Sequence, residues 1–396
     1  MKNELFDYII TTPSINQNSI NISWHSKYNN SFLELSIDGD REFINKKIYK
    51  PIVEEFEKED DLLIGFDKRY INRLTITNLK NNTKYIYRIS VNNQYSDIHS
   101  FITPNKKESF SFSALTDFQC FNNDLTHKLI KQMKEKTDTK LFVCSGDLVD
   151  VAGDEKEWEW VFKDDSFNDL VFAATCGDHE YWKTDLPHVL HFTRPNTFNA
   201  IFNNPKNGIK EALNTNYYFY YNNVLFVFID MSDSNTSYGL LFEKQIEWFK
   251  ETLNNLKGTY DYLIVLNHKS IYGSKEIDSA VRKNITNLFS PIMDEYHVDL
   301  VISGHDHIYS RTYPIFNGEN SEKGTYYLDL GSSGNKYRIP TIDLYEDNLH
   351  EKVINLKEKQ YALSALIKVT KNKMIIEVYN SNNELVDNFI INNKTI

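Results

Sequence analysis

The chain has 396 residues, of which 41% are hydrophobic and 14% aromatic, and its 44 basic and 55 acidic residues give a net charge of −11. This length exceeds that of one ordinary core, so the composition predicts a folded protein of two domains. The negative charge opposes nonspecific attraction to nucleic acid or to an anionic lipid surface. It therefore favours a small substrate over a polyanionic one. We therefore expect no nucleic-acid partner.

The ends and cysteines of the chain bear on its location. Residues 1–7 include an acid and lack the apolar core of a secretory leader, and no run approaches the length of a membrane span. The sequence thus predicts no membrane insertion and favours a cytoplasmic location, with a secreted or cell-surface location left open if a leader was removed. Three cysteines without a CxxC pair, Cys120, Cys144 and Cys176, do not indicate a disulfide framework, which allows a reducing compartment.

The first 104 residues have the pattern of short antiparallel strands. Segments such as 19–24 and 85–91 alternate between two faces, are rich in β-branched and aromatic residues, and are separated by Asn, Asp and Gly turns. A polar hinge at 104–108 follows. We expect an all-β sandwich over 1–104 and a second domain over 109–396.

From residue 109 the pattern changes to strands that alternate with helices, which predicts an α/β domain. The predicted strands are 110–115, 141–144, 171–175, 224–229, 262–266 and 300–302, and the predicted helices are 124–136, 155–162, 240–256 and 277–296. Three tail strands, 362–369, 374–379 and 389–391, are expected to close a second sheet. Residues 183–216 are predicted to form a long, partly irregular insertion beside the site.

Metal-binding side chains follow five of these predicted strands. Ligands bind outside the carboxyl ends of the strands in open α/β sheets, so five such ends describe one site. The three aspartates are about thirty residues apart, the spacing of βαβ units that each deliver one ligand. The number of carboxylate and imidazole groups predicts two metal ions. The segments are Thr116-Asp117-Phe118-Gln119, Ser145-Gly146-Asp147-Leu148-Val149-Asp150, Cys176-Gly177-Asp178-His179-Glu180, Leu266-Asn267-His268 and Ser303-Gly304-His305-Asp306-His307.

These five segments resemble the five motif blocks of the calcineurin-like metallophosphoesterase superfamily. The N-terminal sandwich and the wording of residues 304–314 (GHDHIYSRTYP) resemble the purple acid phosphatase branch, and residues 74–88 and 101–104 resemble parts of fibronectin type III domains. The resemblance covers nearly the whole chain. It implies a four-layer α/β/β/α catalytic sandwich preceded by an all-β fibronectin type III-like sandwich.

The resemblance also implies a ligand set. One metal would be held by Asp117, Asp147 and His307, and the other by Asp147, Asp178, His268 and His305, with Asp147 shared. Two cations roughly 3.5 to 4 Å apart need such a shared anion to offset their repulsion. Mixed carboxylate and imidazole ligation suits Fe, Mn or Zn.

Further roles follow from the residues beside these ligands. His179 would face the phosphate and protonate or hydrogen-bond the leaving oxygen. Asp150 occupies the place of the tyrosine that colours the purple enzymes, so we expect a colourless protein. We favour a role for Asp150 in orienting His179 over the alternative that Asp150 is itself a metal ligand. Asp178 replaces the usual asparagine and adds a negative charge, which predicts tighter metal binding and weaker phosphate affinity. Gln119 replaces a histidine or glycine, and its neutral amide would bind a metal weakly or hold a water.

Three residues outside the ligand set are candidates for substrate binding. Arg311 carries a guanidinium that suits phosphate, although it equally suits bracing the loop after His307. His188 and His191 lie in the insertion and would line the substrate mouth unless they are structural. The remaining histidines match no segment and are expected to be ordinary surface or packed residues.

The sequence therefore predicts a dinuclear metal-dependent phosphoric ester hydrolase that attacks small phosphomonoesters through a metal-bound hydroxide. A phosphodiesterase or nucleotidase on the same metal core is an alternative, because the substrate loops cannot be interpreted from sequence. An alternative of another class is a surface or scaffold protein whose metal site is structural. It draws its support from the departures at Gln119, Asp150 and Asp178.

Overall fold

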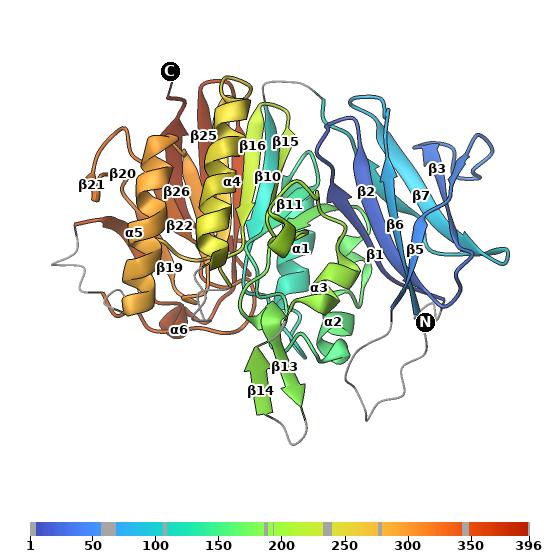
Figure 1. The fold of residues 1–396 in the computed structure, drawn as a ribbon, viewed down its shortest axis with the longest axis horizontal. Helices are drawn as coiled ribbons and strands as arrows, with labels where there is room; N and C mark the ends of the chain where they lie inside the picture. Colours follow the sequence, from blue (N-terminus) through green and yellow to red (C-terminus); the bar gives the residue numbers. More distant parts are fainter. Residues whose placement is uncertain are drawn as a thin grey trace.

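The computed structural model describes residues 5–56, 69–105, 109–185, 189–192, 194–232, 240–275, 279–342 and 348–394. Its N-terminal part contains two antiparallel sheets, at the right of Figure 1. One sheet has the order β1-β2-β6-β5 and the other β4-β3-β7-β8, with β9 paired to β7. The all-β N-terminal part is thereby confirmed. The strands are β1 (Phe6–Pro13), β2 (Ile20–Ser26), β3 (Phe32–Ile37), β4 (Lys47–Tyr49), β5 (Ile52–Phe56), β6 (Arg69–Ile76), β7 (Lys84–Val91), β8 (Gln94–Tyr95) and β9 (His99–Ile102).

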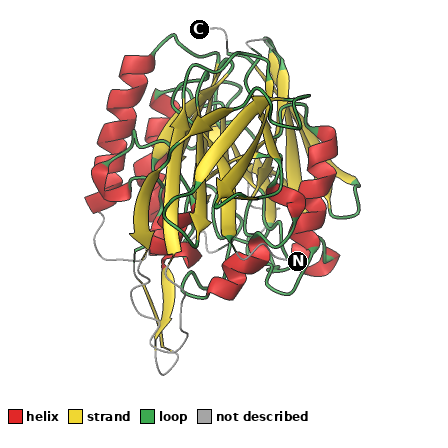
Figure 2. Cartoon of the chain, turned by 90° about the vertical axis from the view of Figure 1, so that its right-hand side faces the viewer, coloured by secondary structure: helices red, strands yellow, loops and turns green. Residues whose placement is uncertain are grey.

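The rest of the chain forms two mixed sheets covered by helices, as the side view in Figure 2 shows. The first sheet has the order β12-β11-β10-β24-β25-β26 and the second the order β15-β16-β17-β18-β22-β19-β23. The first sheet comprises β10 (Phe110–Leu115), β11 (Leu141–Cys144), β12 (Val171–Ala174), β24 (Leu363–Val369), β25 (Lys373–Asn380) and β26 (Leu385–Asn392). The second comprises β15 (Tyr217–Tyr221), β16 (Val224–Ile229), β17 (Tyr262–Lys269), β18 (Leu300–Gly304), β19 (Tyr309–Thr312), β22 (Tyr326–Asp329) and β23 (His350–Ile354).

Helices lie outside the two sheets and short elements join them. The helices are α1 (Leu125–Lys136), α2 (Glu155–Val161), α3 (Asn196–Ile201), α4 (Leu240–Leu256), α5 (Ala280–Glu295) and α6 (Leu356–Lys359). The short strands are β13 (Trp182–Asp185), β14 (Val189–Phe192), β20 (Ile315–Phe316) and β21 (Glu319–Asn320). Among the described helices, none combines the length and the apolar character needed to cross a bilayer.

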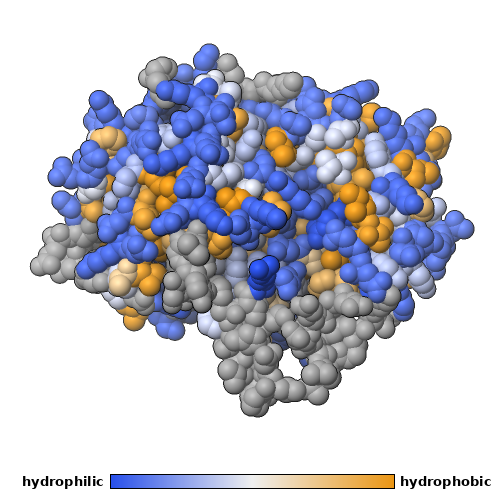
Figure 3. All heavy atoms as spheres, in the orientation of Figure 1, coloured by the Kyte–Doolittle hydropathy of each residue, from blue (hydrophilic) through white to orange (hydrophobic). Residues whose placement is uncertain are grey.

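Alternation along the central strands produces the layers. In β16, Phe226 and Phe228 belong to the core between the sheets, whereas Leu225 and Val227 face the cluster that contains α4 and α5. Successive side chains of a strand point to opposite faces, so a strand buried on both faces reads as a continuous apolar run. The predicted α/β/β/α arrangement is thus confirmed. The described residues on the face seen in Figure 3 are largely hydrophilic, with apolar side chains in separate patches.

The tail strands differ from the expectation that they close a second sheet. β24 pairs antiparallel with β10, and β25 and β26 extend that same sheet. The second sheet is built instead from strands between residues 217 and 354. The pattern of the tail predicts strands correctly, but pairing partners depend on tertiary contacts that a single strand does not encode.

The insertion between β12 and β15 contacts the N-terminal sandwich. It contains the β13–β14 hairpin, which projects downward in Figure 1, and the helix α3. Carbonyls of residues 199–203 accept hydrogen bonds from sandwich side chains, which fixes the sandwich against the α/β part. These bonds are Thr12 Oγ1 to Asn203 O (2.7 Å), Ser23 Oγ to Ile201 O (2.6 Å), Arg73 Nη1 to Phe202 O (2.7 Å) and Arg73 Nη2 to Asn199 O (2.5 Å).

Candidate metal centre

Strand ends from both sheets meet at the predicted site. The parallel strands β10, β11 and β12 end just before Asp117, Asp147 and Asp178. In the second sheet, His268 lies near the end of β17 and His305 directly follows β18. The carboxyl ends of the two sheets therefore converge, which brings together ligands that are far apart in sequence.

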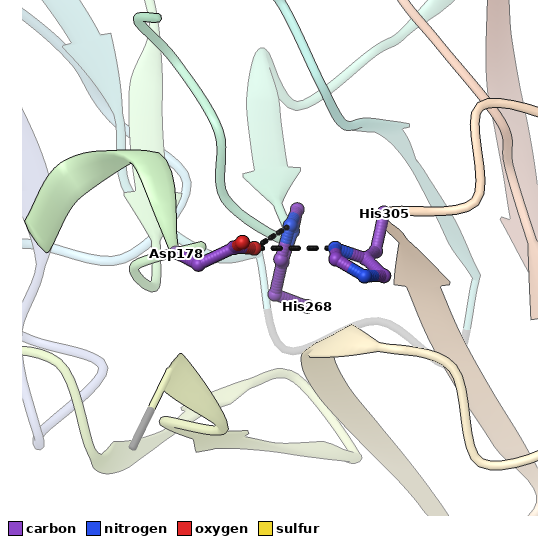
Figure 4. Close-up of side chains that lie close together, drawn as sticks. All are labelled: Asp178, His268 and His305. Carbon is purple, nitrogen blue, oxygen red and sulfur yellow. Dashed lines mark hydrogen bonds and ion pairs between the residues drawn. The ribbon is translucent and has the colours of Figure 1, made fainter. Parts of the chain in front are cut away.

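The predicted ligands form two groups, each with ligand atoms that lie within 4.8 Å of one another. Asp117, Asp147 and His307 form one group, and all three are buried. Asp178, His268 and His305 form the other. In this second group, shown in Figure 4, Asp178 Oδ1 lies 3.1 Å from His305 Nδ1 and 3.2 Å from His268 Nε2.

Asp147 joins the two groups. It belongs to the first group, and its Oδ2 atom also lies 3.2 Å from His268 Nε2 in the second. Its other oxygen, Oδ1, accepts a hydrogen bond from the main-chain N–H of His179 (3.0 Å). This position between the groups is the one that a shared, bridging carboxylate requires.

The backbone at the ligands is in the left-handed region. The φ angles are 45° at Asp117, 56° at Asp147, 73° at His305 and 54° at His307. Residues other than glycine rarely adopt this region, and such conformations persist where the surrounding structure enforces them, often at functional sites. Gly146 has a φ of 109°, and a Cβ there would overlap the main chain of Gly177. The motif glycine before Asp147 is thus required for close approach.

The electrostatics of the centre fit cations. Burial raises the pKa of Asp117 to about 7. Burial also opposes ionisation of Asp147, but the charges of His268 and His179 outweigh it and lower its pKa to about 2. The same carboxylates raise the pKa of His268 well above its usual value, against the effect of burial. Three neighbouring carboxylates in a buried space are costly without opposite charge, so this donor set fits two divalent metal ions.

Gln119 lies within the same set. Its Nε2 atom donates to Asp147 Oδ2 (3.2 Å). Its Oε1 atom is buried and has no hydrogen-bond partner in the described part of the chain. An unpaired buried oxygen suits a weak ligand or a water anchor. The role of Gln119 stays a prediction.

His179 and Asp150 meet in a different way from the expected one. His179 Nδ1 lies 2.6 Å from the main-chain carbonyl of Asp150, whereas the Asp150 carboxylate is 3.9 Å away. That carboxylate is instead paired with Lys336. Asp150 can therefore orient His179 through its backbone, which any residue at this position would provide. His179 Nε2 points to the metal centre, 3.9 Å from Asp147 Oδ2.

Of the three candidate substrate residues, Arg311 alone has a side chain that the structure describes. The Arg311 guanidinium is buried and pairs with Asp387 (Nε to Oδ2, 2.8 Å) and Glu351, beside the ring of Phe389. Two carboxylates already engage this cation, so the geometry favours the bracing role over phosphate binding. His188 lies outside the described residues, as does the side chain of His191.

Comparison with known proteins agrees with this geometry. Residues 94–309, more than half of the chain, match the family described as calcineurin-like phosphoesterase. The chain belongs to the calcineurin-like phosphoesterase family. Residues 7–103 match the purple acid phosphatase N-terminal domain. The predicted superfamily and branch are therefore confirmed.

Individual relatives are distant. Purple acid phosphatase 21 of Arabidopsis thaliana is 26% identical over 275 residues, covering 67% of this chain and 59% of the relative. Phosphoenolpyruvate phosphatase of Allium cepa is 26% identical over 284 residues, covering 68% and 54%. The chain thus spans about three fifths of the length of these curated relatives.

Two solved structures illustrate the shared fold. A purple acid phosphatase from yellow lupin (Lupinus luteus) seeds has a TM-score of 0.78 at 15% identity, covering 98% of this chain and 74% of that one. GAP50, the anchor in the inner membrane complex of Plasmodium, has a TM-score of 0.53 at 17% identity, covering 73% and 90%. These likenesses concern the fold alone.

In this calcineurin-like phosphoesterase, Glu180 is a further residue of the site that was not predicted from the sequence. Its buried carboxylate accepts hydrogen bonds from the N–H groups of Asp147 (2.9 Å), Leu148 (2.7 Å) and Gly177 (2.7 Å). Burial raises the pKa of Glu180 to about 7. Glu180 ties the second and third ligand segments together. Its place directly after His179 in the third motif was an available signal.

The segment at residues 331–338, which follows β22, was also not predicted to belong to the site. It lies against the metal centre but carries no aspartate, glutamate or histidine, so a search for metal ligands does not find it.

Proposed function

We propose that this chain is a dinuclear metal-dependent phosphoric ester hydrolase that acts on phosphomonoesters. The observation that carries the proposal is the pair of ligand groups joined by Asp147. Two divalent ions held there would supply a water of lowered pKa and neutralise charge on the phosphoryl oxygens.

The residues around the ions have separate tasks in this proposal. Asp117 and His307 would hold one ion, Asp178, His268 and His305 the other, and Asp147 both. His179 would donate a hydrogen bond or a proton from Nε2 to the leaving oxygen, while the Asp150 carbonyl holds Nδ1 and fixes the direction of the ring. In the metal-free chain, burial lowers the pKa of His179, but Asp147 and the Asp150 carbonyl outweigh this and raise it.

The preference for a small phosphorylated substrate rests on two supports. The chain carries a net charge of −11, which opposes long polyanions. A relative named phosphoenolpyruvate phosphatase acts on such a small molecule by its name. Fe, Mn and Zn all suit this mixture of carboxylates and imidazoles. We further propose that residues 1–104 and 109–396 are the two domains of the chain.

The test is an assay of p-nitrophenyl phosphate and bis(p-nitrophenyl) phosphate with Mn, Fe or Zn added, with a chelator control. We expect hydrolysis of the monoester that the chelator abolishes. Faster hydrolysis of the diester would favour the phosphodiesterase alternative.

Activity on neither ester with any of the metals would favour a scaffold protein instead. The fold likeness to the Plasmodium anchor GAP50 is the reason to retain the scaffold alternative, because one fold hosts unrelated functions. In the scaffold case, metal would still bind, and elemental analysis of the inactive protein would find it.

A further inference from the structure

The segment at residues 331–338 is fixed to the metal centre by its main chain. The N–H of Ser333 donates to the carbonyl of Thr116 (2.8 Å), the residue before the first ligand. Farther along, the Lys336 carbonyl lies 3.2 Å from His307 Nδ1, and the N–H of Arg338 donates to the His307 carbonyl (3.1 Å). Both sides of Lys336 are therefore held, and its side chain starts from a defined place beside the site.

The Lys336 side chain lies at the open edge of the centre. Its ammonium pairs with the Asp150 carboxylate, and the Asp150 carbonyl holds His179. The side chains of Lys336, Asp150 and His179 are 40%, 30% and 27% exposed, whereas that of Asp147 is 1% exposed. A ligand entering beside His179 thus meets an ammonium group on a flexible side chain that already lies near the reaction site.

A charge balance shows why such a cation is needed. Three ligand carboxylates and a hydroxide cancel the charge of two divalent ions, so the loaded centre itself is neutral. A phosphomonoester dianion brings two negative charges, and a diester brings one. Asp178 supplies the third of these carboxylates, so positive charge from a nearby side chain would favour binding of the monoester more than binding of the diester.

We propose that Lys336 is a substrate-binding residue whose ammonium leaves Asp150 and pairs with a nonbridging phosphoryl oxygen of a phosphomonoester beside His179. This inference rests on the proposed hydrolase function. Asp150 then competes with the substrate for the Lys336 ammonium and holds that group in place while no phosphate is bound. Lys336 thereby favours monoesters over diesters.

The first test is Lys336→Gln in the metal-loaded protein. Loss of one charge-assisted hydrogen bond should raise the KM for p-nitrophenyl phosphate and the dissociation constant of inorganic phosphate about tenfold, with a smaller effect on kcat. The KM for bis(p-nitrophenyl) phosphate should rise about threefold at most, because the diester has less charge to neutralise. Lys336→Arg should restore most of the phosphate affinity.

The matched control is Lys368→Gln. Lys368 has a comparable exposure of 44% and pairs with Glu377 (2.7 Å) on the β24–β25 ladder, away from the ligand segments. This variant should keep the wild-type constants.

A second variant separates substrate binding from a structural ion pair. Asp150→Asn removes the competitor but retains the main-chain carbonyl that holds His179, so inorganic phosphate should bind more tightly. A merely structural pair would weaken phosphate binding in both variants. The inference is overturned if both variants shift the phosphate constant in the same direction, or if Lys336→Gln changes it less than twofold.

Calorimetry of inorganic phosphate with the Mn-loaded protein distinguishes this inference from the hydrolase proposal, because it needs no turnover. Binding that depends on Lys336 in a protein without esterase activity would overturn the hydrolase proposal and support the role of Lys336 as an anion-binding residue. Esterase activity that is indifferent to Lys336→Gln would overturn the inference alone. A wild-type protein that neither hydrolyses esters nor binds phosphate would overturn both.

Discussion

The metal centre and the contact between the sandwich and residues 199–203 both bury polar groups, but they satisfy them differently. In the contact, donors such as Ser23 and Arg73 meet main-chain carbonyls, so these hydrogen bonds form within the chain itself. In the metal centre, Asp147 and Asp178 both lie 3.2 Å from His268, and Asp117 lies in the adjoining ligand group. Burial of like charges is unfavourable unless an opposite charge is added. Buried polar groups that pair within the chain therefore stabilise the fold, whereas buried carboxylates that need an added cation form a binding site.

Removing the shared carboxylate should have the largest effect. Asp147→Asn should lower kcat/KM for p-nitrophenyl phosphate about a thousandfold or more, equivalent to roughly 4 kcal/mol, since both ions lose a ligand. Elemental analysis should find less metal in the variant. The matched control is Asp299→Asn, a buried carboxylate that accepts from the N–H of Leu263 (2.9 Å) outside the ligand set. Full metal content and activity in Asp147→Asn would contradict the bridging role.

Breaking the structural contact should reduce stability and leave metal binding intact. Arg73→Met leaves two carbonyls of residues 199–203 without their charged donor, which should lower the free energy of unfolding by about 3 kcal/mol. Urea unfolding measures this, and metal-induced stabilisation in the same assay should match that of the wild type. Lys250→Met, at the half-exposed pair with Glu295 (3.3 Å), should cost roughly 0.5 kcal/mol or less. Loss of metal binding in Arg73→Met would mean that the two regions are not independent.

Acid should weaken the structural contact through His25. Burial lowers the pKa of His25 to about 3, although its Nε2 atom lies 3.1 Å from the Ala200 carbonyl. Below pH 6.5 the unfolded chain binds a proton that the folded chain does not, so stability falls as the pH falls, by about 2 kcal/mol at pH 5. His25→Gln removes this loss. When the pH is lowered from 7.5 to 5, the wild type should therefore lose about 2 kcal/mol more unfolding free energy than the variant.

Urea unfolding of the chelated protein at the two pH values measures this shift, with the exposed His297→Gln as the control that should follow the wild type. Parallel pH dependence of the wild type and His25→Gln would contradict the assignment.

The smallest effect should come from the extra charge at Asp178. Asp178→Asn would leave the loaded centre with one more positive charge, so the inhibition constant of inorganic phosphate should fall about fivefold, or roughly 1 kcal/mol, while metal binds less tightly. Competitive inhibition of p-nitrophenyl phosphate hydrolysis and a metal titration measure the two changes. If neither constant moves, the charge argument for this position is wrong.

The sequence predicted those features that leave a pattern in side chains. Each ligand follows an apolar strand, and helices such as α4 have a clear apolar stripe, so the site and its layers could be expected. The pairing of β24 with β10 could not, because many partners suit an apolar strand. The contact at residues 199–203 uses main-chain acceptors, which carry no residue signature. Lys336 is one of many lysines until the fold sets it beside Asp150.

The left-handed backbone at Asp117, Asp147, His305 and His307 has a consequence for mutational scans. Glycine is the residue that such dihedral angles suit best, so its introduction would relax the backbone at all four positions, and at Asp117 and Asp147 it would also remove one of the crowded carboxylates. At these four positions, glycine should therefore score well in a scan for folding of the metal-free protein and poorly in a scan for turnover. Selection for thermal stability alone would therefore replace these ligand residues early.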